Sequence, residues 1–85
     1  MKQKISLVLG EVLTEARLRK GLSQNQLARL SGMHRSYIGD LERGARNISI
    51  ENFTALAAAF GVSGSVLLRR MERLQESPAR KRRIG

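Results

Sequence analysis

The chain has 85 residues, which suits one small domain that buries roughly 60% of the surface of its unfolded chain. Sixteen lysines and arginines outweigh seven acids, so the net charge is +9; cysteine is absent and histidine occurs once. This composition excludes disulfide scaffolds, thiol chemistry and cysteine-type zinc fingers, and one histidine does not make a usual zinc site. A small chain this basic points to an anionic partner, nucleic acid first and a membrane surface second.

No segment has the features of a targeting signal or a bilayer span. The apolar stretch at residues 5–9 is interrupted by Ser6 and stopped by Gly10, which makes it too short for a signal peptide. The longest apolar stretch, residues 53–62, is about half of what a bilayer needs. Because cysteine is also absent, we expect a soluble cytoplasmic protein.

The first predicted helix covers residues 5–20. Its apolar residues recur at intervals of three and four, which is typical of one buried helix face, and they are Ile5, Val8, Leu9, Val12, Leu13 and Ala16. Gly21 ends this helix, and Arg19 and Lys20 lie in the last turn, where cations are favoured.

Two short helices are predicted next, over residues 24–31 and 35–43. Ser23 and Gln26 have the spacing of a capping box at the start of the first, and Gly32 separates the two. Two short helices around a glycine turn are the sequence form of a helix-turn-helix. Gly32 suits the turn because it adopts positive φ without strain.

The second of these two helices is expected to present one face to a partner. Ile38 and Leu41 lie three residues apart and attach the helix to the body, while Ala28 allows the preceding helix to approach closely. The free face begins with three polar residues, His34, Arg35 and Ser36. A helix presented in this way can enter the DNA major groove with its N-terminal residues first.

Two further helices complete the domain. Ser49 is the expected N-cap of one that carries Phe53, Leu56, Ala57 and Phe60, and Ser63 is the expected N-cap of the last, with Val66, Leu67, Met71 and Leu74 on one side. No period-two pattern predicts a strand. The expected fold class is therefore all-α, a compact five-helix bundle.

Charge divides the chain into a body and a tail. Residues 1–76 hold twelve bases and all seven acids, a balance of +5, whereas residues 77–85 hold four bases and no acid, a balance of +4. Pro78 ends whatever helix precedes it. We expect a folded DNA-binding domain over 1–76 and a disordered basic tail over 77–85. That tail is either a solubilising end or an additional phosphate contact.

Residues 12–68 resemble the Cro and phage-repressor class of helix-turn-helix domains, which have the lambda-repressor-like fold. Three stretches carry the resemblance: RLRKGLSQNQLA at 17–28, GMHRSYIGDLERG at 32–44 and AAAFGVS at 57–63. Within the class, residues 35–49 are most similar to the small controller proteins of restriction–modification systems. One departure is His34, which stands where serine or threonine usually caps the recognition helix and is a poorer cap.

The position of each residue and the resemblance together predict a DNA-binding set: Gln24, His34, Arg35, Ser36, Tyr37, Arg43, Arg46 and Asn47. Arg35 can donate two hydrogen bonds to guanine, and Ser36 is permissive. Family members touch a phosphate at the start of the second helix, where Gln24 lies. Tyr37 either packs on the DNA backbone or is a structural aromatic. Each of the other side chains is alternatively a solvated surface group.

The roles of two carboxylates remain open or are implied by the family. Asp40 lies on the side of Arg35, so it reads cytosine, restrains Arg35 or lies off the contact. The resemblance implies a salt bridge between Arg17 and Glu42. No catalytic set can be assembled around His34, so we expect no enzyme, no cofactor and no metal.

A homodimer is expected because one helix reads only a few base pairs, and two half-sites lie about 34 Å apart along the duplex. Val66, Leu67 and Leu68 give the last helix more apolar width than one face needs, unless all three are core. The resemblance implies pairing through the fourth and fifth helices, with Val62, Val66 and Leu67 as the candidate interface.

The leading functional hypothesis is a sequence-specific transcriptional regulator that controls a restriction–modification operon. The resemblance implies double-stranded operator DNA with inverted repeats, a second copy of the chain and RNA polymerase as partners, and both activation and repression. The alternative is an antitoxin-like interaction module that also binds its own promoter. A basic surface for RNA or membrane is disfavoured, because the chain has no tryptophan and its basic stretch lacks an amphipathic apolar face.

Overall fold

The computed structural model describes residues 4–76, and this part of the chain is entirely helical apart from its turns. The helices are α1 (Ile5–Arg19), α2 (Gln24–Ser31), α3 (Arg35–Glu42), α4 (Ile50–Phe60) and α5 (Gly64–Gln75). The predicted all-α, five-helix fold is confirmed. The first and third helices end one residue earlier than expected, because Lys20 and Arg43 are C-caps. The predicted tail at 77–85 lies outside the described residues.

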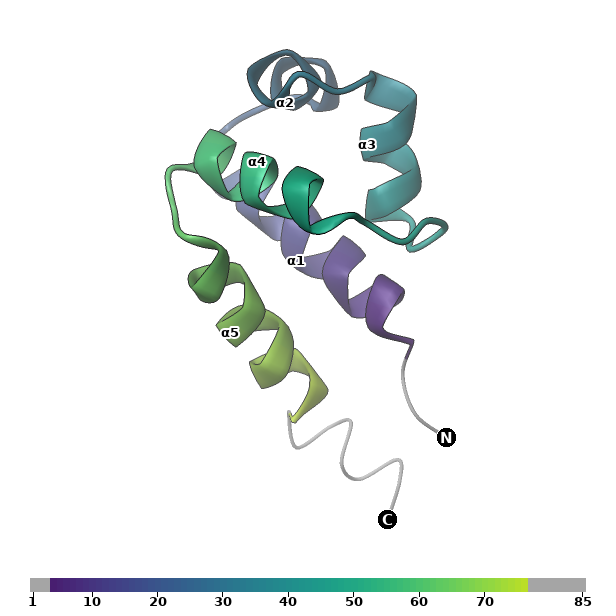
Figure 1. Cartoon of the computed structure of the whole chain (residues 1–85), viewed down its shortest axis with the longest axis vertical. Helices are drawn as coiled ribbons and strands as arrows, with labels where there is room; N and C mark the ends of the chain where they lie inside the picture. Colours follow the sequence, from purple (N-terminus) through teal and green to yellow (C-terminus); the bar gives the residue numbers. More distant parts are fainter. Residues whose placement is uncertain (1–3, 77–85) are drawn as a thin grey trace.

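The helices α2 and α3 occupy one end of the molecule and α5 lies toward the other, with α1 and α4 between them (Figure 1). The helix α1 packs against both α3 and α5, while α2 packs against α3 and α4. The central helices therefore form the scaffold, and α3 is held at the edge of that scaffold by α1 and α2.

Serine is the N-cap of three helices, as predicted, and two of the three serines also make a side-chain capping bond. Ser23 Oγ accepts from the Gln26 amide at 3.0 Å while Gln26 Oε1 accepts from the Ser23 amide at 2.7 Å, which completes the capping box. Ser49 Oγ accepts from the amide of Asn52 at 3.1 Å. Ser63 is the N-cap of α5, but its hydroxyl makes no such bond and instead lies 2.8 Å from the Ser65 hydroxyl.

Two glycines set the position of α3. Gly32 adopts φ +73° in the turn between α2 and α3, as expected. Gly10, in the middle of α1, lies directly against the end of α3: a Cβ at this position would be 2.5 Å from the carbonyl oxygen of Glu42. Only a residue without a side chain permits this close approach of the two helices.

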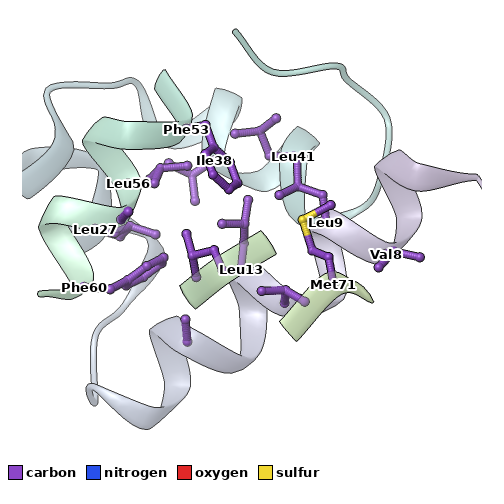
Figure 2. Packing of buried hydrophobic residues seen from close by; sticks show 14 of the residues in the cluster. Val8, Leu9, Leu13, Leu27, Ile38, Leu41, Phe53, Leu56, Phe60 and Met71 are labelled. Atoms are coloured by element: carbon purple, nitrogen blue, oxygen red, sulfur yellow. The ribbon is translucent and has the colours of Figure 1, made fainter. Parts of the chain in front are cut away.

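The core is a single apolar cluster to which every helix contributes (Figure 2). Its buried residues are Val8, Leu9, Val12, Leu13, Ala16, Leu27, Ala28, Ile38, Leu41, Phe53, Leu56, Ala57, Phe60, Leu67 and Met71. Ile5 does not join the apolar face predicted for the first helix, since it is 53% exposed.

Among the described residues, no single helix is both long and apolar enough to cross a bilayer. The helices α4 and α5 meet that criterion only as a pair, and the pair is bent by 98° at its junction.

Candidate nucleic-acid interface

The first turn of α3 is exposed and its opposite face is buried. Ile38 and Leu41 lie in the core with at most 1% of their surface accessible, whereas Arg35 and Ser36 are exposed. Figure 1 shows α3 at the edge of the molecule, beside α2. The helix can therefore present its N-terminal turn to a partner, as the sequence predicted.

The N-cap of α3 is His34, which has an extended backbone and an exposed side chain. The ring makes no capping hydrogen bond. This agrees with the expectation of a poor cap, and it leaves the backbone amides of the first turn without a side-chain acceptor from residue 34.

The C-terminal end of α3 is tied to α1 and α2 through an inner cluster, which we define as Arg17, Gln24 and Glu42. Arg17 donates from Nε to Glu42 Oε2 at 2.7 Å and from Nη2 to Glu42 Oε1 at 3.1 Å. The implied salt bridge is present, and only 14% and 7% of the two side chains are exposed. A third nitrogen, Arg17 Nη1, donates to the carbonyl oxygen of Leu22 at 2.9 Å.

The hydrogen bond to Glu42 and its negative charge raise the pKa of Arg17 above its ordinary value, against the opposing effect of partial burial. A cation with a raised pKa stabilises the fold at every pH below its ordinary pKa, and that stabilisation is lost only as the pH rises through the raised value. The arginine of the inner cluster is therefore charged whenever the protein is near neutral pH.

Gln24 connects the inner cluster to the first turn of α3. Its Nε2 donates to Glu42 Oε1 at 2.9 Å, and its Oε1 accepts from Arg35 Nη1 at 3.2 Å. A carboxylate can only accept, so the amide nitrogen must face Glu42 and the amide oxygen must face Arg35. The sequence predicted Gln24 as a phosphate contact and did not predict this link to Arg35.

A second group of charges, the outer cluster, lies around the end of α3 and consists of Asp40, Arg43 and Arg46. Asp40 Oδ1 accepts from Arg43 Nη2, and Asp40 Oδ2 lies 3.9 Å from Arg46 Nη1. The side chains of both arginines are more than half exposed. Of the roles left open for Asp40, the pairing with Arg35 is not observed; the carboxylate pairs with these two arginines instead.

Tyr37 lies between the outer cluster and α4. The guanidinium carbon of Arg46 is 5.0 Å from the centre of the tyrosine ring, within the range of a cation–π contact. The tyrosine hydroxyl accepts from Asn52 Nδ2 at 3.1 Å. Sequence reasoning missed Asn52, which reaches Tyr37 across 15 residues and is visible in the sequence only as a first-turn residue of a helix.

These side chains surround a polar hollow of about 390 Å³ beside α3. Its lining consists of Gly32, Met33, His34, Ser36, Tyr37, Asp40, Arg46 and Asn52. Arg43 and Asn47 are exposed nearby in the chain but do not line it. Of the eight residues of the predicted DNA-binding set, five lie on α3 itself, at its N-cap or at its C-cap.

The predicted dimer interface requires a correction. Leu67 is completely buried in the core, so it is not available to a second chain, while Val62 and Val66 are half-buried. The exposed apolar side chain of α5 is its neighbour Leu68, at 49% exposure. Consecutive residues of a helix point about 100° apart, so Leu67 can face the core while Leu68 faces outward.

Leu68 belongs to an apolar groove of about 390 Å³ between α1, α4 and α5. Ile5 and Ile50, which are 53% and 69% exposed, lie along the same groove. Its remaining lining residues are Ser6, Leu9, Arg46, Asn47, Ile48, Ser49, Phe53 and Met71. Within residues 4–76, no group of three histidine or acidic side chains is placed to hold a metal ion.

The chain matches the helix-turn-helix family model over residues 13–67. It is 41% identical over 69 residues to the control protein C.BamHI of Bacillus amyloliquefaciens, covering 80% of this chain and 85% of that protein.

Two solved structures are also similar. The restriction-modification controller protein C.AhdI of Aeromonas hydrophila is 47% identical, with a TM-score of 0.71 over 73% of this chain and 94% of that chain. The controller protein C.Esp1396I, as a tetramer in complex with its natural 35 base-pair operator, is 28% identical, with a TM-score of 0.77 over 85% of this chain and 95% of that chain.

Proposed function

This chain belongs to the helix-turn-helix family that includes the restriction–modification controller proteins, and we propose that it is a sequence-specific DNA-binding regulator of a restriction–modification operon. One observation of the structure carries the proposal. The first turn of α3 is exposed, while the core residues Ile38 and Leu41 and the inner cluster hold the helix in place. A rigid helix that projects an arginine is suited to read base edges in the major groove.

Arg35 is the proposed base-reading residue. Its guanidinium can donate two parallel hydrogen bonds to O6 and N7 of guanine. In the protein alone, Arg35 Nη1 donates to an amide oxygen, Gln24 Oε1, at 3.2 Å. A single exposed hydrogen bond to an uncharged amide is weak enough to be exchanged for a base edge. Ser36 and His34 flank Arg35 and lie on the same exposed turn.

Phosphate contacts are assigned to the side chains on either side of that turn. Arg43, Arg46 and Asn47 follow α3 and are exposed, so they can reach the strand beside the groove. Gln24 has a second amide proton beyond the one donated to Glu42, and it lies at the N-terminus of α2. Tyr37 is assigned to the sugar–phosphate backbone next to Arg46.

We propose that the active species is a dimer that pairs along the apolar groove of Ile5, Ile50 and Leu68, and binds an inverted repeat. These three large side chains are at least 49% exposed and line one groove, and a contiguous exposed apolar surface is typical of an interaction site. Sedimentation should detect a species of twice the 9.5 kDa chain mass, and Leu68→Glu should return it to the monomer. A chain that remains a monomer at micromolar concentration, with and without DNA, would count against pairing.

A regulator bound at a promoter represses transcription by blocking access of RNA polymerase to the DNA. Activation requires in addition a contact with RNA polymerase, and the likeness to the controller proteins supports this part of the proposal. Because the proposed target is operator DNA, we propose that the protein acts in the cytoplasm.

Selection of bound duplexes from a random DNA pool tests the main proposal. We expect an enriched sequence with two-fold symmetry, bound at least a thousandfold more tightly than a scrambled duplex. An enriched pool without a shared sequence would reject sequence-specific regulation, and would leave only generic binding by a basic surface.

A further inference from the structure

An acidic residue lies in the middle of the proposed DNA surface. Asp40 is on α3, five residues after Arg35, and its side chain is 30% exposed. DNA is a polyanion, so a carboxylate at this position opposes binding unless it has another purpose. The two positive side chains that Asp40 contacts indicate what that purpose is.

Both arginines of the outer cluster are held by this one carboxylate. Arg43 donates to Oδ1, and Arg46 lies against Oδ2 at 3.9 Å while its guanidinium also covers the ring of Tyr37. The same two arginines are the strongest candidates for contact with DNA phosphates, since both are exposed and directly follow the recognition helix.

A carboxylate and a phosphate compete for the same donors. Both accept charge-assisted hydrogen bonds from a guanidinium, and both can do so with two oxygens. While Asp40 holds the arginines, a duplex that meets the surface loosely gains neither contact. Exposed ion pairs are weak, so a duplex that docks closely can break them.

We infer that Asp40 is a specificity-determining residue that withholds Arg43 and Arg46 from phosphates until α3 is seated in its operator; this rests on the proposed function. At an operator, the base contacts of Arg35 and close docking of the helix offset the cost of breaking the two ion pairs. At other sequences nothing offsets that cost, so binding proceeds with two fewer phosphate contacts. The carboxylate therefore lowers sequence-independent affinity more than operator affinity.

The test compares Asp40→Asn with a control of equal charge change, Glu72→Gln. Glu72 is exposed on α5, which packs against α1 and α4. Each protein is titrated with the selected operator and with a scrambled duplex, from about 50 to 200 mM salt. For Asp40→Asn we expect roughly tenfold tighter binding to the scrambled duplex and a salt dependence steeper by about two. Operator affinity should rise less than fivefold.

A second background tests whether the effect passes through the two arginines. In a protein that already carries Arg43→Ala and Arg46→Ala, Asp40→Asn should change the scrambled-duplex affinity no more than Glu72→Gln does. Circular dichroism checks that each variant is folded. An equally large effect of Asp40→Asn in this background would overturn the inference, because the carboxylate would then act by direct repulsion.

Two other outcomes also overturn it. If Asp40→Asn behaves like Glu72→Gln in the otherwise unchanged protein, Asp40 does not withhold the arginines. If Asp40→Asn weakens operator binding and leaves scrambled-duplex binding unchanged, the carboxylate reads a base instead. In both cases the parent protein still prefers its operator, so the proposed function stands. A parent protein without that preference would defeat the proposed function itself.

Discussion

Two carboxylates of α3, two residues apart, have opposite surroundings. Glu42 is 7% exposed and accepts three hydrogen bonds from Arg17 and Gln24, whereas Asp40 is 30% exposed and pairs with two exposed arginines. The inner cluster joins three helices, and its ion pair is largely buried. The outer cluster joins one helix to the loop that follows it.

The difference teaches that burial, and not the identity of the charged group, decides what an ion pair does for a protein. Removing one partner of a buried pair strands the other charge, which costs several kcal/mol, while an exposed pair contributes about 0–1 kcal/mol. We therefore assign the inner cluster to holding α3 in position and the outer cluster to controlling access to phosphates.

The largest expected effect is on stability, from Glu42→Ala. This change leaves the Arg17 guanidinium, 14% exposed, without its carboxylate, and should lower the free energy of unfolding by about 3 kcal/mol. Asp40→Ala is the matched change in the outer cluster and should cost less than about 1 kcal/mol. Urea denaturation measures both. Equal losses would break the comparison, and a loss below about 1 kcal/mol for Glu42→Ala would show that the pair is not effectively buried.

The next effect should come from Gly10→Ala, which presses on the end of α3 that carries the inner cluster. The new Cβ would lie 2.5 Å and 2.8 Å from the carbonyl oxygens of Glu42 and Leu41, which are backbone atoms and cannot rotate away. We expect a loss of about 2 kcal/mol, as for other overpacked sites.

Gly39→Ala is the control for that change, because its nearest neighbour is the end of the flexible Arg43 side chain at 3.4 Å. It should be neutral or stabilising by up to about 1 kcal/mol, since alanine favours a helix. Thermal melts of the two variants compare them directly, and an unchanged melting temperature for Gly10→Ala would mean that α1 and α3 can move apart freely.

A smaller effect, on binding alone, is expected from Arg35→Ala. Loss of the proposed guanine contact should remove about 1–2 kcal/mol of the preference for operator over scrambled DNA while most of the salt dependence is retained. Fluorescence anisotropy titrations with both duplexes measure the ratio. An unchanged specificity ratio would show that base reading is carried by another residue.

The smallest effect should come from Arg46→Ala in the outer cluster. It should weaken operator binding and reduce the salt dependence of that binding by about one, because one phosphate contact is lost. Binding to the scrambled duplex should change less, because Asp40 withholds Arg46 from phosphates there. The same titrations apply, repeated at several salt concentrations. An equal loss of affinity for both duplexes would show that Arg46 reaches phosphates at any sequence, and the assignment of the outer cluster to controlling access to phosphates would need revision.

Most of the fold could be predicted because helices are local structures. A helix is signalled by apolar residues at intervals of three and four and by caps within one turn, and these signals were sufficient for α2 at Gln24–Ser31. Ser63 is the N-cap of α5, as predicted, but its hydroxyl pairs with the Ser65 hydroxyl and makes no bond to a backbone amide, which the spacing did not indicate.

The candidate site was only partly predictable. The exposure of Arg35 followed from the burial expected for Ile38 and Leu41, because opposite faces of a helix cannot both be buried at the edge of a bundle. The partners of the polar side chains did not follow, since Asp40 had several cations within reach and spacing alone could not select among them. Asn52 was missed for the same reason: its partner Tyr37 is on another helix.

The sequence by itself determined the five helices, the glycine turn between α2 and α3 and the basic character of the chain, because each depends on composition or on neighbours a few residues away. Only the tertiary structure decided that Leu67 is core while Leu68 is exposed, and that Glu42 is enclosed while Asp40 is open. The physical reason is that both distinctions depend on the orientation of α3 and α5 against α1, which arises when distant segments pack together.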